Sequence, residues 1–318
     1  MTHASDRDRA NIGEASTFAV REEHDPEAVR ALLSEDPSFA AFALGHLEPE
    51  LLPHSRFWTA EGPGGRTGIV MHARANLGRT TVLAGDPDAV QAVLSLHPGP
   101  GGGYLATCAP EHLPVAERVY DLGDPLHMMR MTVDSHAFRD PPAAAMQGVR
   151  RLVRADARQL NALYATGDGP TGYRGEHIER GVYFGVFDEG QLRAVAGTHM
   201  LAPHIGIAVV GNVFTHASAR GRGLAGAVTA AVTRELFARG CATVTLTVDP
   251  ENTPAVRAYQ RLGYVAGAPI VEARIRRRDV FGLGSLLRRL LTRRDDDGAA
   301  LVRASLRPDD GRTGRSES

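Results

Sequence analysis

Residues 220–225 have the composition of a loop that binds an anion. They are Arg220, Gly221, Arg222, Gly223, Leu224 and Ala225. The apolar stretch that ends in Val213, Phe214 and Thr215 predicts a strand before this loop, and a helix is expected to begin within it. The first turn of a helix has backbone N–H groups without partners and carries the positive end of the helix dipole. Because glycines admit a close approach and arginines add charge, the loop is predicted to bind a pyrophosphate.

A later helix, expected to be capped by Thr253 and to stop at Gly263, carries a candidate general acid. Tyr259 has a hydroxyl proton that a strong base can remove. Ala255 lies one turn earlier, where a small side chain leaves room for a ligand. Asn252 precedes the helix, and its side chain either binds that ligand or caps the turn.

These two groups of residues resemble motifs of the GNAT acetyltransferase superfamily. Arg220-x-x-Gly223-x-Ala225 is similar to the family's Arg/Gln-x-x-Gly-x-Gly/Ala loop, which holds the pyrophosphate of acyl-coenzyme A. Residues 252–264 resemble its next motif, the helix that flanks the coenzyme thiol. The motifs and the segment between them span residues 206–265, about a fifth of the chain.

The resemblance implies acetyl-coenzyme A as co-substrate and an acyl-coenzyme A-dependent N-acyltransferase activity without a metal. Residues 220–225 would hold the pyrophosphate, and a strand bulge at residues 213–215 would pair with the pantetheine arm. A backbone N–H there would stabilise the oxyanion, and Tyr259 would protonate the departing thiolate. Acetyl transfer to a primary amine by direct attack in a ternary complex is expected, because the motifs contain no cysteine to carry the acyl group.

Two alternatives stay open at this point. A non-catalytic acyl-coenzyme A sensor would keep the loop and lose turnover. A dinucleotide-dependent oxidoreductase is also conceivable, because Gly221-x-Gly223-x-x-Gly226 spells a G-x-G-x-x-G pattern and Asp249 follows the next strand. That pattern normally turns directly off the first strand of its domain, whereas here residues 216–220 intervene and the unit lies deep in the chain.

The general base is less clearly indicated. His199, at the end of a predicted strand, is the favoured candidate, because an imidazole titrates near neutral pH. Five other residues are further candidates: His204, His216, Asn212, which could only orient a water, Glu176 and Tyr183. The acceptor is expected to be a small-molecule or peptide amine.

Composition limits the other possible functions. The chain of 318 residues has a formal net charge of −1, so no general attraction to nucleic acid is expected. No apolar run reaches the ~18 residues of a membrane-spanning helix. Cys108 and Cys241 are the only cysteines, and the first 16 residues lack an apolar segment typical of a secretion signal. A cytoplasmic protein is therefore expected.

Two tandem units of mixed α+β structure are predicted, each a mostly antiparallel sheet with flanking helices, as the family resemblance implies. Their ranges are residues 17–138 and 148–277, joined by a proline-containing linker at residues 140–147. Residues 1–16 are expected to be a disordered leader. Residues 278–318 are expected to be an Arg- and Asp-rich tail, whose apolar and basic stretch suggests either a terminal helix or a docking segment.

The second unit carries the motifs, and the first contains a weak echo of them. Residues 116–123 parallel residues 255–263 with one residue missing, which places Tyr120 opposite Tyr259. No Arg-Gly loop precedes the helix expected at residues 89–96. The first unit is therefore interpreted as a degenerate copy that cannot bind coenzyme A, similar to the paired arrangement in the glycine N-acyltransferase-like branch. An unrelated α/β cap is the alternative, and either could cover the acceptor site or form a homodimer.

Overall fold

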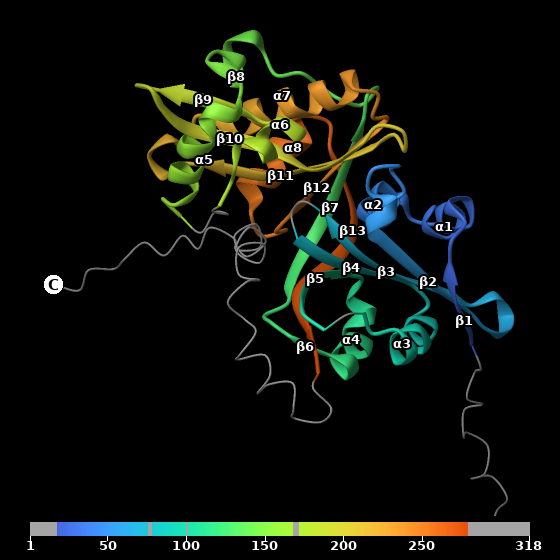
Figure 1. Cartoon of the computed structure of the whole chain (residues 1–318). Coiled ribbons are helices and arrows are strands. Elements are labelled where there is room, and N and C mark those ends of the chain that lie inside the picture. Colours follow the sequence, from blue (N-terminus) through green and yellow to red (C-terminus); the bar gives the residue numbers. More distant parts are fainter. Residues whose placement is uncertain (1–17, 76–77, 100, 168–171, 279–318) are drawn as a thin grey trace, which may run out of the picture.

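The computed structural model describes residues 18–75, 78–99, 101–167 and 172–278 (Figure 1). The expected leader at residues 1–16 and all of the expected tail except Arg278 lie outside the described residues. The described strands form a single long sheet, with helices packed on both of its faces.

The N-terminal half ends at residue 134. Its elements are β1 (Ala19–Glu23), α1 (Pro26–Leu33), α2 (Pro37–Gly45), β2 (Ser55–Glu61), β3 (Thr67–Ala75), β4 (Gly78–Gly85), α3 (Pro87–Leu96), β5 (Gly103–Cys108), α4 (Leu113–Val119), β6 (Tyr120–Leu122) and β7 (Leu126–Asp134).

The C-terminal half repeats the same order of elements, apart from the short strand β6. Its elements are β8 (Val149–Arg151), α5 (Ala157–Tyr164), α6 (Gly175–Arg180), β9 (Phe184–Asp188), β10 (Gln191–Ala202), β11 (Ile207–Thr215), α7 (Leu224–Ala238), β12 (Thr243–Val248), α8 (Thr253–Arg261) and β13 (Val265–Arg277). The expected mixed α+β fold is therefore confirmed.

The two halves exchange their last strands. The strand order is β1-β2-β3-β4-β5-β13-β7-β12-β11-β10-β9-β8. Strand β7 of the N-terminal half pairs along the whole of β12, and β13 of the C-terminal half pairs along the whole of β5. Among the described pairings only β4 with β5 and β11 with β12 are parallel, so the sheet is mostly antiparallel as predicted. Each half is thus completed by a strand from the other.

Alternation along the strands divides the core into layers. Val70, Leu83 and Val271 pack with α3 and α4, whereas Met71 and Ile270 pack with α1 and α2 on the opposite face. Figure 1 shows these helix pairs on the two sides of the sheet. In the C-terminal half, α7 and α8 cover one face and α5 and α6 cover the other.

Local sequence features explain where several elements of the C-terminal half begin and end. Glu189 and Gly190 both have positive φ, as the tight hairpin between β9 and β10 requires. Gly240 has φ +94° immediately after the last turn of α7, the position expected of a helix-ending glycine. The cap of α8 is shifted by one residue, because the side chain of Asn252, not Thr253, accepts a hydrogen bond from the Ala255 amide.

Two other expectations need correction. Tyr120 lies in β6, after α4 has ended at Val119, so it does not occupy a position like that of Tyr259 within a helix. The segment at residues 140–147 is not a free linker, because its ends pack on the C-terminal half. Asp140 forms an ion pair with Arg234 of α7 at 2.6 Å, and residues 143–146 form a short 3-10 helix.

Candidate active site

Strands β11 and β12 separate at the point where the sequence motifs meet. Their parallel pairing ends at Val210 opposite Leu246, and residues 211–215 of β11 then leave β12. A bulge between Gly211 and Phe214 changes the register against β10, and Asn212 within it has φ +55°. Backbone groups on the β12 side of residues 211–215 therefore have no ladder partner and can accept an extended ligand as an added strand.

The amino end of α7 lies directly beyond this separation. Gly221 and Gly223 both have φ +76°, and a Cβ at either position would meet no atom within 4 Å. No side chain caps α7, and within the described residues the amides of residues 221–226 donate no hydrogen bond. This combination of open space and free amides is that of a phosphate site.

The two arginines of the loop are exposed and already oriented around it. The Arg220 Nε atom lies 3.4 Å from the Thr215 carbonyl oxygen. Arg222 forms an exposed ion pair with Asp188 at 3.2 Å. An exposed pair of this kind contributes little stability, so a phosphate can displace Asp188 from Arg222 at small cost.

Helix α8 places Tyr259 in the core of the C-terminal half. Its side chain is buried, and its hydroxyl bonds to no other described residue. Burial raises the pKa of Tyr259 above its ordinary value. The neighbouring Tyr264 differs, because its hydroxyl lies 2.8 Å from the Thr233 hydroxyl. Ala255 packs against the same core, and Asn252 caps the helix through its side-chain oxygen.

His199 lies next to the bulge of β11. It is itself the extra residue of a second irregularity, between Thr198 and Met200 of β10. Its ring fills the space over Gly211, where a Cβ would come within 2.3 Å of the imidazole. Burial lowers the pKa of His199, while the nearby Asn212 side chain opposes this effect. A neutral imidazole at this place can accept a proton.

The other candidate bases have different positions. His204 bonds to Glu48 in the turn at the far end of β11, and His216 caps the 3-10 helix at residues 217–219 through the Ser218 amide. Glu176 pairs with Arg154 at the surface. The buried Tyr183 hydroxyl donates to the Thr198 carbonyl at 3.2 Å.

Three residues close to the site did not emerge from the sequence. Tyr164 and Tyr173 are buried beside the bulge. Arg130, on β7 of the N-terminal half, is 2% exposed, and its Nη1 donates to the Thr247 hydroxyl at 2.7 Å. Its charge also lowers the pKa of His199. An arginine within the apolar run at residues 126–133 was the one available signal, since a lone charge in a central strand is unusual.

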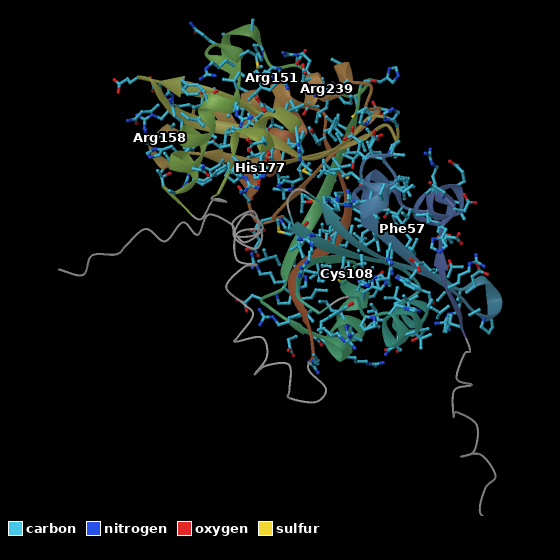
Figure 2. The ribbon with its side chains drawn as sticks, viewed as in Figure 1. Phe57, Cys108, Arg151, Arg158, His177 and Arg239 are labelled. Atoms are coloured by element: carbon cyan, nitrogen blue, oxygen red, sulfur yellow. The ribbon has the colours of Figure 1, made fainter. Side chains whose placement is uncertain are left out.

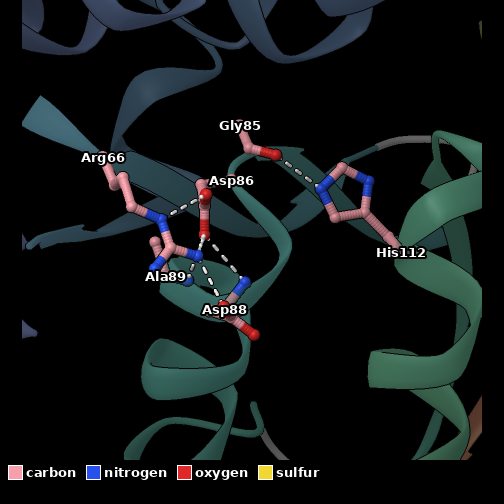
Figure 3. Close-up of polar contacts among 6 residues, drawn as sticks. All are labelled: Arg66, Gly85, Asp86, Asp88, Ala89 and His112. Atoms are coloured by element: carbon pink, nitrogen blue, oxygen red, sulfur yellow. Dashed lines mark hydrogen bonds and ion pairs between the residues drawn. The ribbon is translucent and has the colours of Figure 1, made fainter. Parts of the chain in front are cut away.

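The N-terminal half has no equivalent anion site among its described residues. Helix α3 starts immediately after β4, and the Asp86 carboxylate accepts hydrogen bonds from the amides of Asp88 and Ala89 (Figure 3). Arg66 binds both Asp86, at 2.7 Å, and Asp88, and hydrogen bonding to Arg66 lowers the pKa of Asp86. Fixed carboxylates therefore occupy the place where a phosphate would bind in the other half.

Neither thiol is suited to carry an acyl group. Cys108 and Cys241 are buried, and burial raises their pKa values to about 12 and about 11. Figure 2 shows Cys108 within the N-terminal half. Within the described residues, no cluster of His, Cys, Asp and Glu could hold a metal ion. No helix of the described part is long and apolar enough to span a bilayer.

Part of this chain is similar to known proteins. Residues 150–264 match the model of the Acetyltransferase (GNAT) family. A Drosophila protein of known structure is 17% identical, with a TM-score of 0.56 over 81% of this chain and 98% of its own. A GCN5-related N-acetyltransferase-like protein from Streptococcus suis is 13% identical, with a TM-score of 0.50 over 80% of this chain and 98% of its own.

A third solved structure, a GCN5-related N-acetyltransferase from Kribbella flavida, is 22% identical, with a TM-score of 0.45 over 65% of this chain and 85% of its own. A search of curated proteins gave no match. The first two structures show that the fold extends over both halves of the chain. The family model covers the loop at residues 220–225, the separated strands and Tyr259. Residues 150–264, about a third of the chain, are thus similar to the Acetyltransferase (GNAT) family.

Proposed function

We propose that this chain is an acyl-coenzyme A-dependent N-acyltransferase that transfers acetyl from acetyl-coenzyme A to a primary amine. The observation that carries the proposal is the open, glycine-lined amino end of α7 at the mouth of the separated strands β11 and β12. This arrangement fits a diphosphate followed by an extended arm, which are the two parts of coenzyme A that precede its thioester.

In this proposal the pyrophosphate binds the free amides of residues 221–226 and the guanidinium groups of Arg220 and Arg222. The pantetheine arm lies along residues 213–215 in the gap left by β12. A backbone N–H at Val213 or Phe214 donates to the carbonyl oxygen as the tetrahedral intermediate forms. Asn252 is assigned to the cap of α8, and its free amide nitrogen can still reach the coenzyme.

Transfer is direct in a ternary complex. The amine attacks the thioester carbon while His199 takes its proton, directly or through a water. The carbon–sulfur bond then breaks, and the electron pair leaves on the thiolate. Burial keeps Tyr259 protonated, and its hydroxyl proton passes to the departing sulfur as negative charge develops there. The two buried cysteines support direct attack, because neither is a competent acyl carrier.

Two measurements on the whole protein test the proposal. Calorimetry with acetyl-coenzyme A is expected to show one site per chain, because carboxylates fill the equivalent place in the N-terminal half. Thiol release is then followed with a panel of amines that includes amino acids, polyamines, aminoglycosides and peptide N-termini. Coenzyme binding without thiol release for any amine would favour a non-catalytic sensor. The absence of any coenzyme binding would contradict both the enzyme and the sensor.

A further inference from the structure

The backbone of the bulge in β11 is held by residues outside both sequence motifs. Asn212 has φ +55°, a left-handed conformation that Asn adopts more readily than most residues but still at a cost relative to glycine. Such a conformation persists only where surrounding contacts impose it. The contacts around Asn212 therefore decide whether the amide of Val213 or Phe214 faces the thioester.

Tyr164 provides the most direct of these contacts. Its hydroxyl donates to the Asn212 carbonyl at 2.6 Å, which is short for a hydroxyl–carbonyl hydrogen bond. Tyr164 is the last residue of α5, so the contact joins two elements that are 48 residues apart in sequence. Its side chain is fully buried, which excludes competition from bulk water.

Neighbouring aromatic rings fix the Tyr164 ring in place. The Tyr173 ring stacks on it with centroids 5.5 Å apart, and the Phe214 ring meets it edge-on at 5.6 Å. Phe214 belongs to the bulged segment itself. Tyr164 therefore contacts β11 on both sides of residue 213, through its hydroxyl at Asn212 and through its ring at Phe214. Burial raises the pKa of Tyr164 well above its ordinary value, so the hydroxyl remains a donor throughout the working pH range.

The Asn212 side chain links the bulge held by Tyr164 to the candidate base, His199. It lies close enough to both His199 and Tyr183 to raise the pKa of His199 and to lower that of Tyr183, against the opposite effects of burial. Rotation of the Asn212 backbone would move this side chain away from His199 and turn the following amides out of the gap. The Tyr164 hydroxyl thus supports two catalytic features, which are the position of the oxyanion donor and the orientation of the base.

We infer that Tyr164 is a positioning residue, which holds the β11 bulge in its catalytic geometry through the Asn212 carbonyl without touching either substrate. This inference rests on the proposed function. It goes beyond that proposal by assigning a role to the first helix of the C-terminal half, which lies outside the coenzyme motifs.

Tyr164→Phe removes the hydroxyl and keeps the ring contacts. The expected result is a fall of about tenfold or more in kcat, as for loss of an aligned oxyanion donor. The KM for acetyl-coenzyme A should stay within about twofold, because the phosphate loop is unchanged. Amide hydrogen exchange of residues 211–215 should become faster, since the left-handed backbone loses its main restraint.

Tyr120→Phe is the matched control. Tyr120 is equally buried, and its hydroxyl also donates to a backbone carbonyl, that of Pro98 at 3.0 Å, but it lies in the N-terminal half. Both variants lose a similar hydrogen bond and should lose similar thermal stability. Equal kcat values for the two variants, or unchanged exchange at residues 211–215 in Tyr164→Phe, would overturn the inference. The exchange measurement needs no turnover, so it tests Tyr164 even if the wild-type protein transfers no acyl group.

Discussion

At the scale of single residues, the two tyrosines of the α8 motif have opposite environments. Tyr259 has a buried ring and a hydroxyl that bonds to no described residue, whereas the Tyr264 hydroxyl bonds to Thr233. Tyr259→Phe is expected to lower kcat roughly a hundredfold, the usual size of a lost general acid, with coenzyme affinity unchanged. Stopped-flow thiol release and calorimetry measure the two quantities.

Tyr264→Phe separates this effect from a structural one. It removes an equally buried hydroxyl and is expected to cost about 1 kcal/mol of unfolding free energy with no change in kcat. A Tyr259→Phe enzyme that turns over as fast as Tyr264→Phe would remove Tyr259 from the mechanism.

His199 makes a prediction about pH. Its pKa lies below the ordinary histidine value because the ring is buried, so the base is already neutral at pH 7. The rate constant kcat/KM should stay flat through neutral pH and fall only below pH ~6.5, where the ring gains a proton. His199→Gln should have a low rate without this acidic limb. An acidic limb that survives in His199→Gln assigns the base to another group.

The same lowered pKa affects stability. The unfolded chain binds a proton at His199 more tightly than the folded chain does. The contribution of neutral His199 to the free energy of unfolding is therefore complete above the pKa of the unfolded chain, ~6.5, and is lost as the pH falls below it.

At the scale of elements, the two ends of α7 allow the proposed phosphate site to be tested with a matched pair of variants. Gly223 before the helix and Gly240 after it both have positive φ, and at neither position would an added Cβ meet another atom within 4 Å. Gly223→Ala and Gly240→Ala are each expected to cost about 1 kcal/mol, because both force alanine into a left-handed backbone.

Only Gly223→Ala should also weaken the binding of the coenzyme, by about tenfold. The methyl group of the alanine would occupy the side from which a phosphate approaches the amides. Thermal unfolding and calorimetry of the pair test this difference. An equal affinity in both variants would place the phosphate elsewhere.

At the scale of the whole molecule, the exchanged strands predict that both halves unfold together. Without β7, strand β12 would lose all of its partners on one side, and β5 would likewise lose β13. Trp58 is the only tryptophan and lies in the N-terminal half, where it stacks on His97. Its fluorescence reports on that half, and coenzyme binding reports on the other.

Both signals should be lost at the same denaturant concentration, as expected for one cooperative unit. Two separate transitions would show that each half is stable without the strand of its neighbour. A conservative change far from the exchange, such as Ser95→Ala on α3, should leave the two signals coincident and serves as the control.

Much of the C-terminal half was predictable because its signals are local. The positive-φ glycines that flank α7, the hairpin at Glu189 and Gly190, and the alternation of β12 each depend on a few adjacent residues. The phosphate loop belongs to the same class, since its glycines, its arginines and the helix start are contiguous. The position of Tyr120 was predicted wrongly. Helix α4 ends at Val119, and strand β6 begins at Tyr120.

The chain sequence alone thus determined the motifs, the Arg- and Gly-containing loop at residues 220–225 and the place of Tyr259 in a helix, because contiguous residues specify each of them. Only the tertiary structure placed the His199 ring over Gly211, brought Tyr164 to the Asn212 carbonyl and set Arg130 of the first half beside Thr247 of the second. The physical reason is that these contacts join residues far apart in sequence, and strand order and register decide which of them meet.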